Sequence, residues 1–560
     1  MNQTKLLLTA VVKPYGVKDE YSEWLGMEME LFDCQLTRNQ GVHSPRANYR
    51  TNALYLLAEN VSVPTTVLDF PGWDEFVGEI ERGYTHVGIS FSGPNVYKAK
   101  RMAEHIRSVS PGTKIILGGY AAGIPEIRDI VPCDEVCAKD GIRWLREYFG
   151  ESPDAPVRHP LMSDTVQVHM YGARIPGNRS SVLFTGLGCN GACFFCATAS
   201  KFGRYIPLFE DGRQVFDICR RAEAELGAVF FSVQDENFLI ADGRARQLEA
   251  EMERHGKTYR FFTFSSAEAV ARLGVDFLVR MGVTSIWIGV ESRSLGLQKT
   301  RGIDLHALIR DLQDHGISVI ASMILFLDHH DKESIEADVN WALGLGADIN
   351  QFLQLMPVPG TPLFSRMMEE GRMGPNPPYP KMNGQNELPF KHPHFTSEEA
   401  VAYTNAVSLR KYRLHGPGLL SMALTSILGY KRAVSDARMR EEQGLAWNPA
   451  TLRYEKTEGA ARDEYMQLRL KEMKSFAGNA RVFLLPMWVF APGAAARRKA
   501  VDAMRLLDEV IGRATVKERV LSVFLTFLSC LEYLRHWAWR TFKGIPFVRQ
   551  PPSQRIEYRQ

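Results

Sequence analysis

Three cysteines lie close together in the middle of the chain: Cys189, Cys193 and Cys196, with the spacing Cys-x3-Cys-x2-Cys. They directly follow the apolar run 182–184, which predicts that a buried strand positions their loop. A structural zinc site takes four protein ligands, whereas an iron–sulfur cube held by three thiolates keeps one iron open for chemistry. Zinc binding and simple burial of the thiols are the alternatives, although no further Cys or His occurs in the twenty residues after Cys196.

The cysteine spacing, with Phe195 just before the last cysteine, resembles the cluster loop of radical S-adenosylmethionine (SAM) enzymes. This resemblance implies a 4Fe-4S cluster on Cys189, Cys193 and Cys196, which are therefore the expected metal ligands and catalytic centre. In that family the open iron binds SAM, and an electron from the cluster cleaves it to a 5'-deoxyadenosyl radical. The resemblance thus implies an enzyme.

Length and composition narrow the class of protein further. The chain has 560 residues, 45% hydrophobic residues and 23% charged residues, which is typical of a folded protein with several units. The net charge of +3 is too small to indicate a nucleic-acid partner. Eight scattered cysteines do not form a disulfide framework, and an oxygen-sensitive cluster needs a reducing compartment, so we expect a cytoplasmic protein.

The first 150 residues alternate short apolar runs with helical patterns, which predicts a doubly wound parallel sheet. Such sheets bind ligands at the carboxyl ends of their strands. Two of these ends are polar or rich in glycine, although such residues also make simple tight turns. The candidate cofactor-binding residues are Ser90, Ser92, Gly118, Gly119 and Tyr120. The expected strands are 6–12, 65–70, 86–91, 114–117 and 135–138, with a helix at 95–108.

This region resembles the cobalamin-binding domain of B12-binding radical SAM enzymes, because Ile116-Leu117-Gly118-Gly119 is followed by Pro125-Glu126. The resemblance implies cobalamin as a second cofactor. The Asp-x-His-x-x-Gly signature, which provides an axial histidine in other cobalamin proteins, is absent, and the loop 137–141 lacks the acidic pattern of the class. A domain that has lost cobalamin is the alternative.

After a proline-rich linker at 151–176, a second series of alternating strands and helices runs to residue 371. Six strand–helix units predict an open (βα)6 barrel, in which catalytic groups lie at the carboxyl ends of the strands. The cysteine loop follows the first of them. The expected strands are 181–185, 228–233, 260–264, 285–289, 318–327 and 349–355, and the expected helices are 213–226, 243–255, 267–281, 305–315 and 332–345.

Acidic residues end two of these strands and resemble the SAM-binding positions of the B12-binding class. Asp235-Glu236-Asn237-Phe238 follows the second strand, and Gly289-Val290-Glu291-Ser292 follows the fourth. By resemblance, Asp235 is the first choice for the SAM amino group, with Glu236 beside it, while Glu291 and Ser292 approach the ribose or the amino-acid end. Carboxylates suit both tasks, because they accept charge-assisted hydrogen bonds. A helix N-cap is the alternative for either acid.

Two further loops lie on the expected active face. The proline-rich element 356–364 resembles the segment that closes many of these cores, and we expect it to act as a scaffold. His329 and His330, in an acidic loop after the fifth strand, are candidates for metal binding, proton transfer or substrate contact. A solvated polar loop that precedes a helix is the simpler explanation, because adjacent histidines on a loop usually point apart.

Residues 372–560 are expected to be mainly helical and to form part of a substrate cover. Two apolar stretches, 482–491 and 520–534, are too short to span a bilayer. The second stretch is followed by tryptophans and basic residues. We therefore expect 520–543 to form a buried helix, an oligomer contact or a peripheral membrane contact.

These features lead to one main interpretation and two rivals. By resemblance, the chain is a cobalamin-dependent radical SAM methyltransferase that acts on an unactivated carbon of a small-molecule or lipid-like substrate, with an electron donor such as flavodoxin or ferredoxin. The first rival is a radical ring contraction, cyclisation or rearrangement without methyl transfer. The second is a zinc-stabilised binding protein without catalysis.

Overall fold

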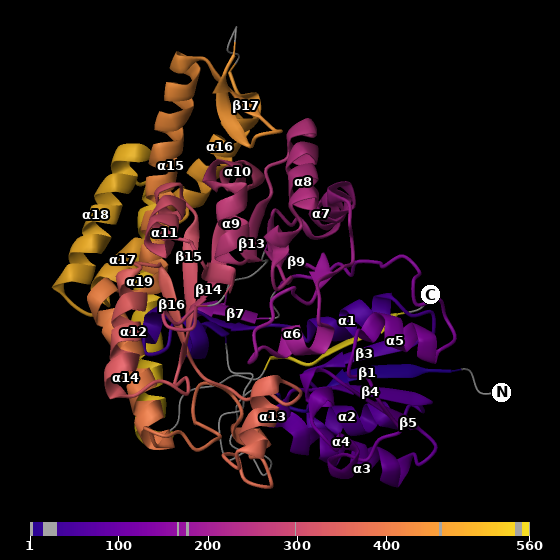
Figure 1. Ribbon diagram of the computed structural model, residues 1–560. Coiled ribbons are helices and arrows are strands. Elements are labelled where there is room, and N and C mark those ends of the chain that lie inside the picture. Colours follow the sequence, from indigo (N-terminus) through magenta and orange to yellow (C-terminus); the bar gives the residue numbers. More distant parts are fainter. Residues whose placement is uncertain are drawn as a thin grey trace.

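The computed structural model describes residues 4–14, 31–164, 167–174, 179–296, 298–457, 462–543 and 551–558. Two parallel sheets and a helical C-terminal region make up the molecule (Figure 1). The N-terminal sheet lies beside the carboxyl edge of the second sheet, and the C-terminal helices pack against the far side of that second sheet. The predicted α/β class is confirmed.

The N-terminal sheet is doubly wound. Its order is β19-β3-β1-β4-β5-β6, and β1 pairs in parallel with both β3 and β4, so the strand order reverses at this point. Helices cover both faces: α1 (Asn52–Glu59) and α5 (Gly141–Tyr148) lie on one, α2 (Trp73–Ile80) and α3 (Val96–Val109) on the other (Figure 1). The parallel strands are β1 (Leu6–Ala10), β3 (Thr65–Asp69), β4 (His86–Ser90), β5 (Lys114–Gly118) and β6 (Glu135–Val136).

The edge strand of this sheet comes from the opposite end of the chain. β19 (Gln554–Tyr558) pairs antiparallel with β3, and the Arg555 guanidinium lies 2.7 Å from the Glu79 carboxylate of α2. Pairing covers an edge that would otherwise expose unsatisfied backbone groups. The C-terminal region is mainly helical as predicted, but this strand was not foreseen.

The second sheet has six parallel strands among the described residues, in the order β16-β15-β14-β13-β12-β9. Neighbours in the sheet are also neighbours along the chain, as an open (βα)6 barrel requires. The predicted strands are all present, with small shifts at their ends. They are β9 (Ser180–Leu183), β12 (Phe230–Val233), β13 (Arg260–Phe264), β14 (Val283–Glu291), β15 (Ser318–Leu325) and β16 (Ile349–Gln354). The helices between them include α7 (Gly212–Leu226), α8 (Asp242–Arg254), α11 (Leu305–Asp314) and α12 (Lys332–Gly344).

Two local expectations are corrected. The single helix predicted at 267–281 is two helices, α9 (Ala267–Leu273) and α10 (Val275–Met281), because Gly274 between them has φ +81° and ψ 154°. The segment 151–176 was predicted to be a linker. Within its described part, β7 (Gln167–Met170) and β8 (Ala173–Arg174) form a small sheet with β2 (Arg46–Asn48).

The C-terminal helices hold the barrel closely. A methyl group on Gly429 of α15 would lie 2.1 Å from the Cα atom of Gly316, in the turn before β15. No described helix is long and apolar enough to cross a membrane. The helices are α14 (Ser397–His415), α15 (Gly418–Gln443), α16 (Glu464–Gly478), α17 (Arg481–Val489), α18 (Ala494–Val510) and α19 (Val516–Lys543).

We predict that Gly429→Ala lowers the thermal unfolding midpoint. The added methyl group must push α15 away from a backbone that cannot yield, and overpacking of this kind costs roughly 1–3 kcal/mol. Gly478→Ala in α16 is the matched control, since its methyl group meets only Ile511 Cδ1 at 3.9 Å and alanine favours a helix. Equal midpoints for the two variants would contradict the close packing.

Candidate active site

The three cysteines converge around one short turn after β9. A methyl group added to Gly191 would lie 3.4 Å from Cys189 Sγ and 3.8 Å from Cys193 Sγ, so the turn lies between these sulfur atoms. The backbone N–H of Gly191 donates to Cys189 Sγ, and that of Ala199, in the first turn of α6 (Ala197–Phe202), donates to Cys196 Sγ. Such donors favour thiolates, so this donor set fits an iron–sulfur cluster.

A partly buried ion pair lies beside the cysteines. Glu291, at the end of β14, accepts a short hydrogen bond from Lys299. A side chain at Gly289 would collide with both groups, at 2.3 Å from Glu291 Oε1 and 2.5 Å from Lys299 Nζ. Burial lowers the pKa of Lys299, but the Glu291 carboxylate outweighs burial and raises it overall. The Lys299 charge also acts on Cys193, where it opposes the rise in thiol pKa that burial causes.

A cavity of about 410 Å³ lies between the N-terminal sheet and the cysteine loop. The predicted residues Ser90, Gly118, Gly119 and Tyr120 line it on the side of the sheet, and Glu236 lines it on the side of the barrel. Ser92 is not among its lining residues. The deeper wall is apolar and lies between the sheet and the helices α1 and α5, with Leu54, Leu57, Trp144 and Leu145. The carboxyl ends of both sheets therefore meet at one cavity.

Helix α6 joins the two sides of this cavity. Thr198 Oγ1 lies 2.9 Å from the Tyr120 hydroxyl and donates to Glu236 Oε1 at 3.0 Å. One turn later, Lys201 donates to the carbonyl oxygen of Gly119 at 2.9 Å. Because α6 starts at Cys196, the cysteine loop is held directly against the cofactor crevice of the N-terminal sheet.

Asp235 and Glu236 point to different places. Asp235 is 1% exposed and accepts hydrogen bonds from Thr185, Tyr205 and Arg244, so it serves the interior of the barrel. Glu236 faces the cavity, where surrounding protein desolvates its carboxylate and raises its pKa. The prediction that an acid after β12 faces the cofactor therefore rests on Glu236, whereas the geometry disfavours Asp235 for that task.

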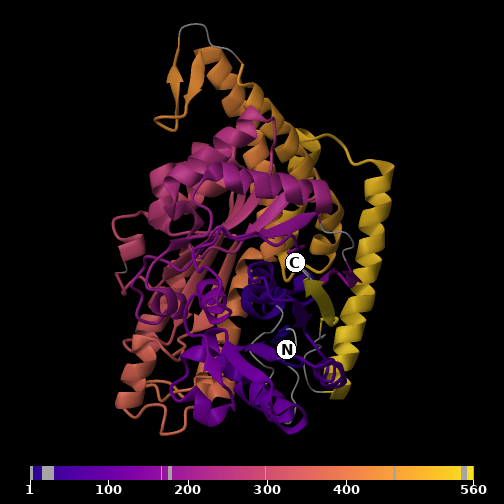
Figure 2. The ribbon, with the colours of Figure 1, turned by 90° about the vertical axis from the view of Figure 1, so that its right-hand side faces the viewer.

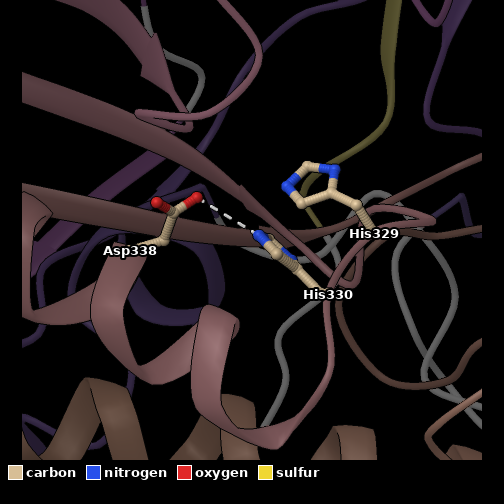
Figure 3. A group of neighbouring side chains, drawn as sticks. All are labelled: His329, His330 and Asp338. Carbon is tan, nitrogen blue, oxygen red and sulfur yellow. Dashed lines mark hydrogen bonds and ion pairs between the residues drawn. The ribbon is translucent and has the colours of Figure 1, made fainter.

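The turn after Glu291 is anchored by side chains from the next strand–helix unit. Glu291 itself has φ +56°. Ser292 donates a short hydrogen bond to Asp338 of α12, and His330 Nε2 lies 3.2 Å from the same carboxylate oxygen (Figure 3). Ser292 is thus engaged in positioning Glu291.

The two adjacent histidines have different roles. The backbone N–H of Leu327 donates to His330 Nδ1, so Nε2 carries the proton that is shared with Asp338. Both ring nitrogens of His330 are therefore occupied. Exposed His329 lies 2.6 Å from the Ser294 hydroxyl, which lies 2.7 Å from that of Ser292. If each contact carries one proton, the donors run from His329 through the two serines to Asp338, which favours proton transfer over metal binding at this group.

Two segments complete the active face. Leu363, in the proline-rich element, donates its N–H to the Phe194 carbonyl oxygen of the cysteine loop, and Gly360 contacts Gly123 of the N-terminal unit. This arrangement agrees with the predicted scaffold role. From the connector before α14, the Gly384 carbonyl oxygen accepts from Gln354 N, so the connector lies at the carboxyl end of β16.

Sequence reasoning missed four polar residues of this site. For three of them, the position relative to a motif could have indicated a role: Thr198 and Lys201 follow the last cysteine, and Lys299 follows Gly-x-Glu-Ser. No motif lies close enough to Arg244, in the first turn of α8, to indicate its role. The missed residues are Thr198, Lys201, Arg244 and Lys299.

No protein-family profile matches the chain. Among curated proteins, hopanoid C-2 methylase from Rhodopseudomonas palustris (strain TIE-1) is 23% identical over 238 residues. The match covers 40% of this chain and 43% of that protein, so less than half of the relative's length is spanned. This similarity agrees with the family resemblance drawn from the sequence.

Two solved structures were also found to be similar to this chain. Both are of TsrM from Kitasatospora setae, a radical SAM methyltransferase, one with tryptophan and a SAM analogue bound and the other with cobalamin and a 4Fe-4S cluster. Each match has a TM-score of 0.46 and covers 76% of the solved chain. The first is 16% identical over 66% of this chain, and the second is 15% identical over 67% of it. The proteins found by these comparisons are thus named as a methylase and a methyltransferase.

We predict that amide substitutions at the neighbouring carboxylates Asp235 and Glu236 have different effects, one on the stability of the fold and the other on SAM binding. Asp235→Asn should destabilise the fold, because breaking a buried ion pair costs about 3–5 kcal/mol. Glu236→Gln should keep the melting temperature and weaken SAM binding by roughly tenfold or more, the value of a charge-assisted hydrogen bond. Calorimetric unfolding and SAM titration of the cluster-loaded protein measure the two effects. A stable Asp235→Asn variant with lost SAM binding would reverse the assignment.

We also predict acid sensitivity from His159, which supports the strand before the cysteines. Its Nε2 accepts the Phe184 N–H at 2.9 Å, and burial lowers its pKa to about 3. In the unfolded chain, this histidine has a pKa of about 6.5, so it binds a proton there before it does in the folded protein. Its contribution to the free energy of unfolding is therefore complete above pH 6.5 and falls as the pH drops toward 3.

Between pH 7 and pH 5, we expect protonation of this histidine alone to lower the free energy of unfolding by about 2 kcal/mol. Urea unfolding at the two pH values measures it. His159→Gln retains an acceptor but has no titrating group, so its pH dependence should be smaller by that amount. An unchanged slope would contradict the prediction.

Proposed function

We propose that this chain is a cobalamin-dependent radical SAM methyltransferase that acts on an unactivated carbon. The observation that carries the proposal is the cavity that the crevice of the doubly wound sheet shares with Gly188 and Thr198, which flank the three convergent cysteines. Such an arrangement suits a reaction that brings two cofactors together at one place. The similarity to a methylase and the family resemblance of the motifs support it.

The chain's own residues have defined tasks in this proposal. Cys189, Cys193 and Cys196 hold the cluster. Lys299 suits the carboxylate of SAM, and Glu236 and Glu291 suit its ammonium and hydroxyl groups, because each pairs opposite charge or accepts charge-assisted hydrogen bonds. Once bound, the cluster would supply an electron, SAM would supply the radical that removes hydrogen from the substrate, and cobalamin would supply the methyl group. The protein places the three at one cavity.

The sheet side of the cavity is the proposed cobalamin site. Gly118 leaves open space at the end of β5, and Gly119, whose side-chain position is taken by the Phe91 backbone, follows it together with Tyr120. Ser90 ends β4 beside them. The apolar slot behind them lies between the sheet and α1 and α5. A flat macrocycle with a long appended arm fits a mouth with polar groups and a deep apolar slot.

The substrate is proposed to be a small or lipid-like molecule. The relative's name gives a hopanoid as the molecule it methylates. The connector before α14 forms part of the proposed substrate cover, because it lies at the carboxyl end of β16. An electron donor such as flavodoxin or ferredoxin and a reducing, cytoplasmic compartment belong to the same proposal.

Cysteine substitution tests the cluster. We expect Cys193→Ala to lose iron and 5'-deoxyadenosine formation while its melting temperature stays close to wild type, since the loop is outside the barrel's apolar core. Cys530→Ser is the matched control, because Cys530 is exposed on α19 and should change neither. Anaerobic metal analysis with SAM cleavage measures both. Stoichiometric zinc without iron in the wild-type protein would support the binding-protein rival instead.

Product mass separates methylation from rearrangement. A methylated product is heavier than its substrate by one CH2 group, whereas ring contraction or cyclisation without methyl transfer adds none. The assay uses anaerobic protein loaded with cluster, cobalamin and SAM. Product without added mass, formed equally well without cobalamin, would favour the rearrangement.

A further inference from the structure

Helix α19 presents a long apolar face to solvent. Phe527 is 57% exposed and Trp537 is 59% exposed, on a helix of 28 residues. Leu521 and Tyr533 are also exposed at the flanks of the helix, but most of its exposed apolar residues recur every three or four positions and share one side. They are Val516, Val520, Val523, Phe524, Phe527, Leu531, Leu534 and Trp537. In Figure 2 the yellow helix α19 runs along the outer edge of the molecule.

The side of α19 that faces the protein carries polar residues beside Leu525, Leu528 and Trp539. Ser522 and Ser529 are buried. His536 lies between Glu532, at 2.7 Å, and Arg46 of β2, at 3.2 Å. A surface helix of a globular domain normally buries its apolar side, whereas α19 leaves most of its large apolar residues exposed. An apolar face of this length, turned outward, indicates contact with an apolar environment.

The charges of α19 identify that environment. Its two acidic residues are held near the protein surface: Glu532 bonds to Arg535 and His536, and Glu518 lies 3.7 Å from Arg481. Lys517, Arg519 and Arg540 are exposed. The outer side of the helix is therefore both apolar and positively charged. Basic residues beside an apolar face, with a tryptophan at its border, are typical of helices that lie in the interface of an anionic bilayer.

The apolar surface continues onto the neighbouring helix. α17 packs along α19, and the Phe490 ring, just after α17, lies 6.0 Å from the Tyr533 ring. Trp488 and Val489, at the end of α17, are also exposed. Two helices thus contribute to one outward surface.

We propose that α19 docks this protein on the surface of an anionic lipid bilayer, with its apolar face in the interface and its axis along the membrane plane. Docking of this kind does not depend on the proposed reaction. It would bring a lipid-like substrate close to the enzyme.

Flotation of the full-length protein tests the proposal. We expect wild type to float with vesicles of phosphatidylcholine and phosphatidylglycerol and much less with pure phosphatidylcholine. Val523→Gln, Phe527→Gln and Leu531→Gln combined should lower binding by at least roughly tenfold, since each removes apolar area from the interface. Leu414→Gln, Leu428→Gln and Val434→Gln combined are the matched control, because they change equally exposed apolar residues of α14 and α15.

A second readout does not depend on the folding of a triple variant. Brominated lipids should quench the fluorescence of wild type, and the Trp537→Phe variant should lose that part of the quenching. Wild type that fails to float, a triple variant that floats equally well, or a dimer that the triple variant abolishes without any vesicle binding would each overturn the proposal. Formation of 5'-deoxyadenosine in solution should be the same in wild type and both triple variants, which separates docking from the reaction.

Discussion

The contact between helix α6 and the crevice of the N-terminal sheet is the constraint on which the site depends. Thr198 bonds to Tyr120 and Glu236 together, and Lys201 bonds to the Gly119 carbonyl oxygen. These bonds fix the cysteine loop relative to two sheets that come from separate parts of the chain. A cofactor on either sheet is therefore held at a defined position relative to the other.

Buried charge stabilises the rim of the barrel around this contact. Asp235 receives hydrogen bonds from Thr185 just after β9, from the segment after α6 and from α8 through Arg244. On the other side, Asp338 holds Ser292 and His330, and thereby the turn that carries Glu291. Both carboxylates are engaged by several partners, whereas Glu236 faces the cavity and Glu291 pairs with Lys299 beside the cysteines.

The C-terminal region connects the two units and reaches the outside of the molecule. α15 contacts the barrel closely enough that Gly429 and Gly316 touch, and β19 completes the N-terminal sheet. Between these contacts, α19 keeps its apolar side outward. One region of the chain therefore both ties the units together and offers a surface for lipid.

The sequence by itself determined both parallel sheets, since apolar runs that alternate with helical patterns allow few other folds. It also determined the cysteine loop and the acidic strand ends, because their spacing is local. Only the tertiary structure decided that Glu236 and not Asp235 faces the cavity, since successive residues at a strand end point in different directions. The pairing of Lys299 with Glu291, the strand β19 and the outward apolar face of α19 likewise depend on packing between distant segments, which local patterns do not encode.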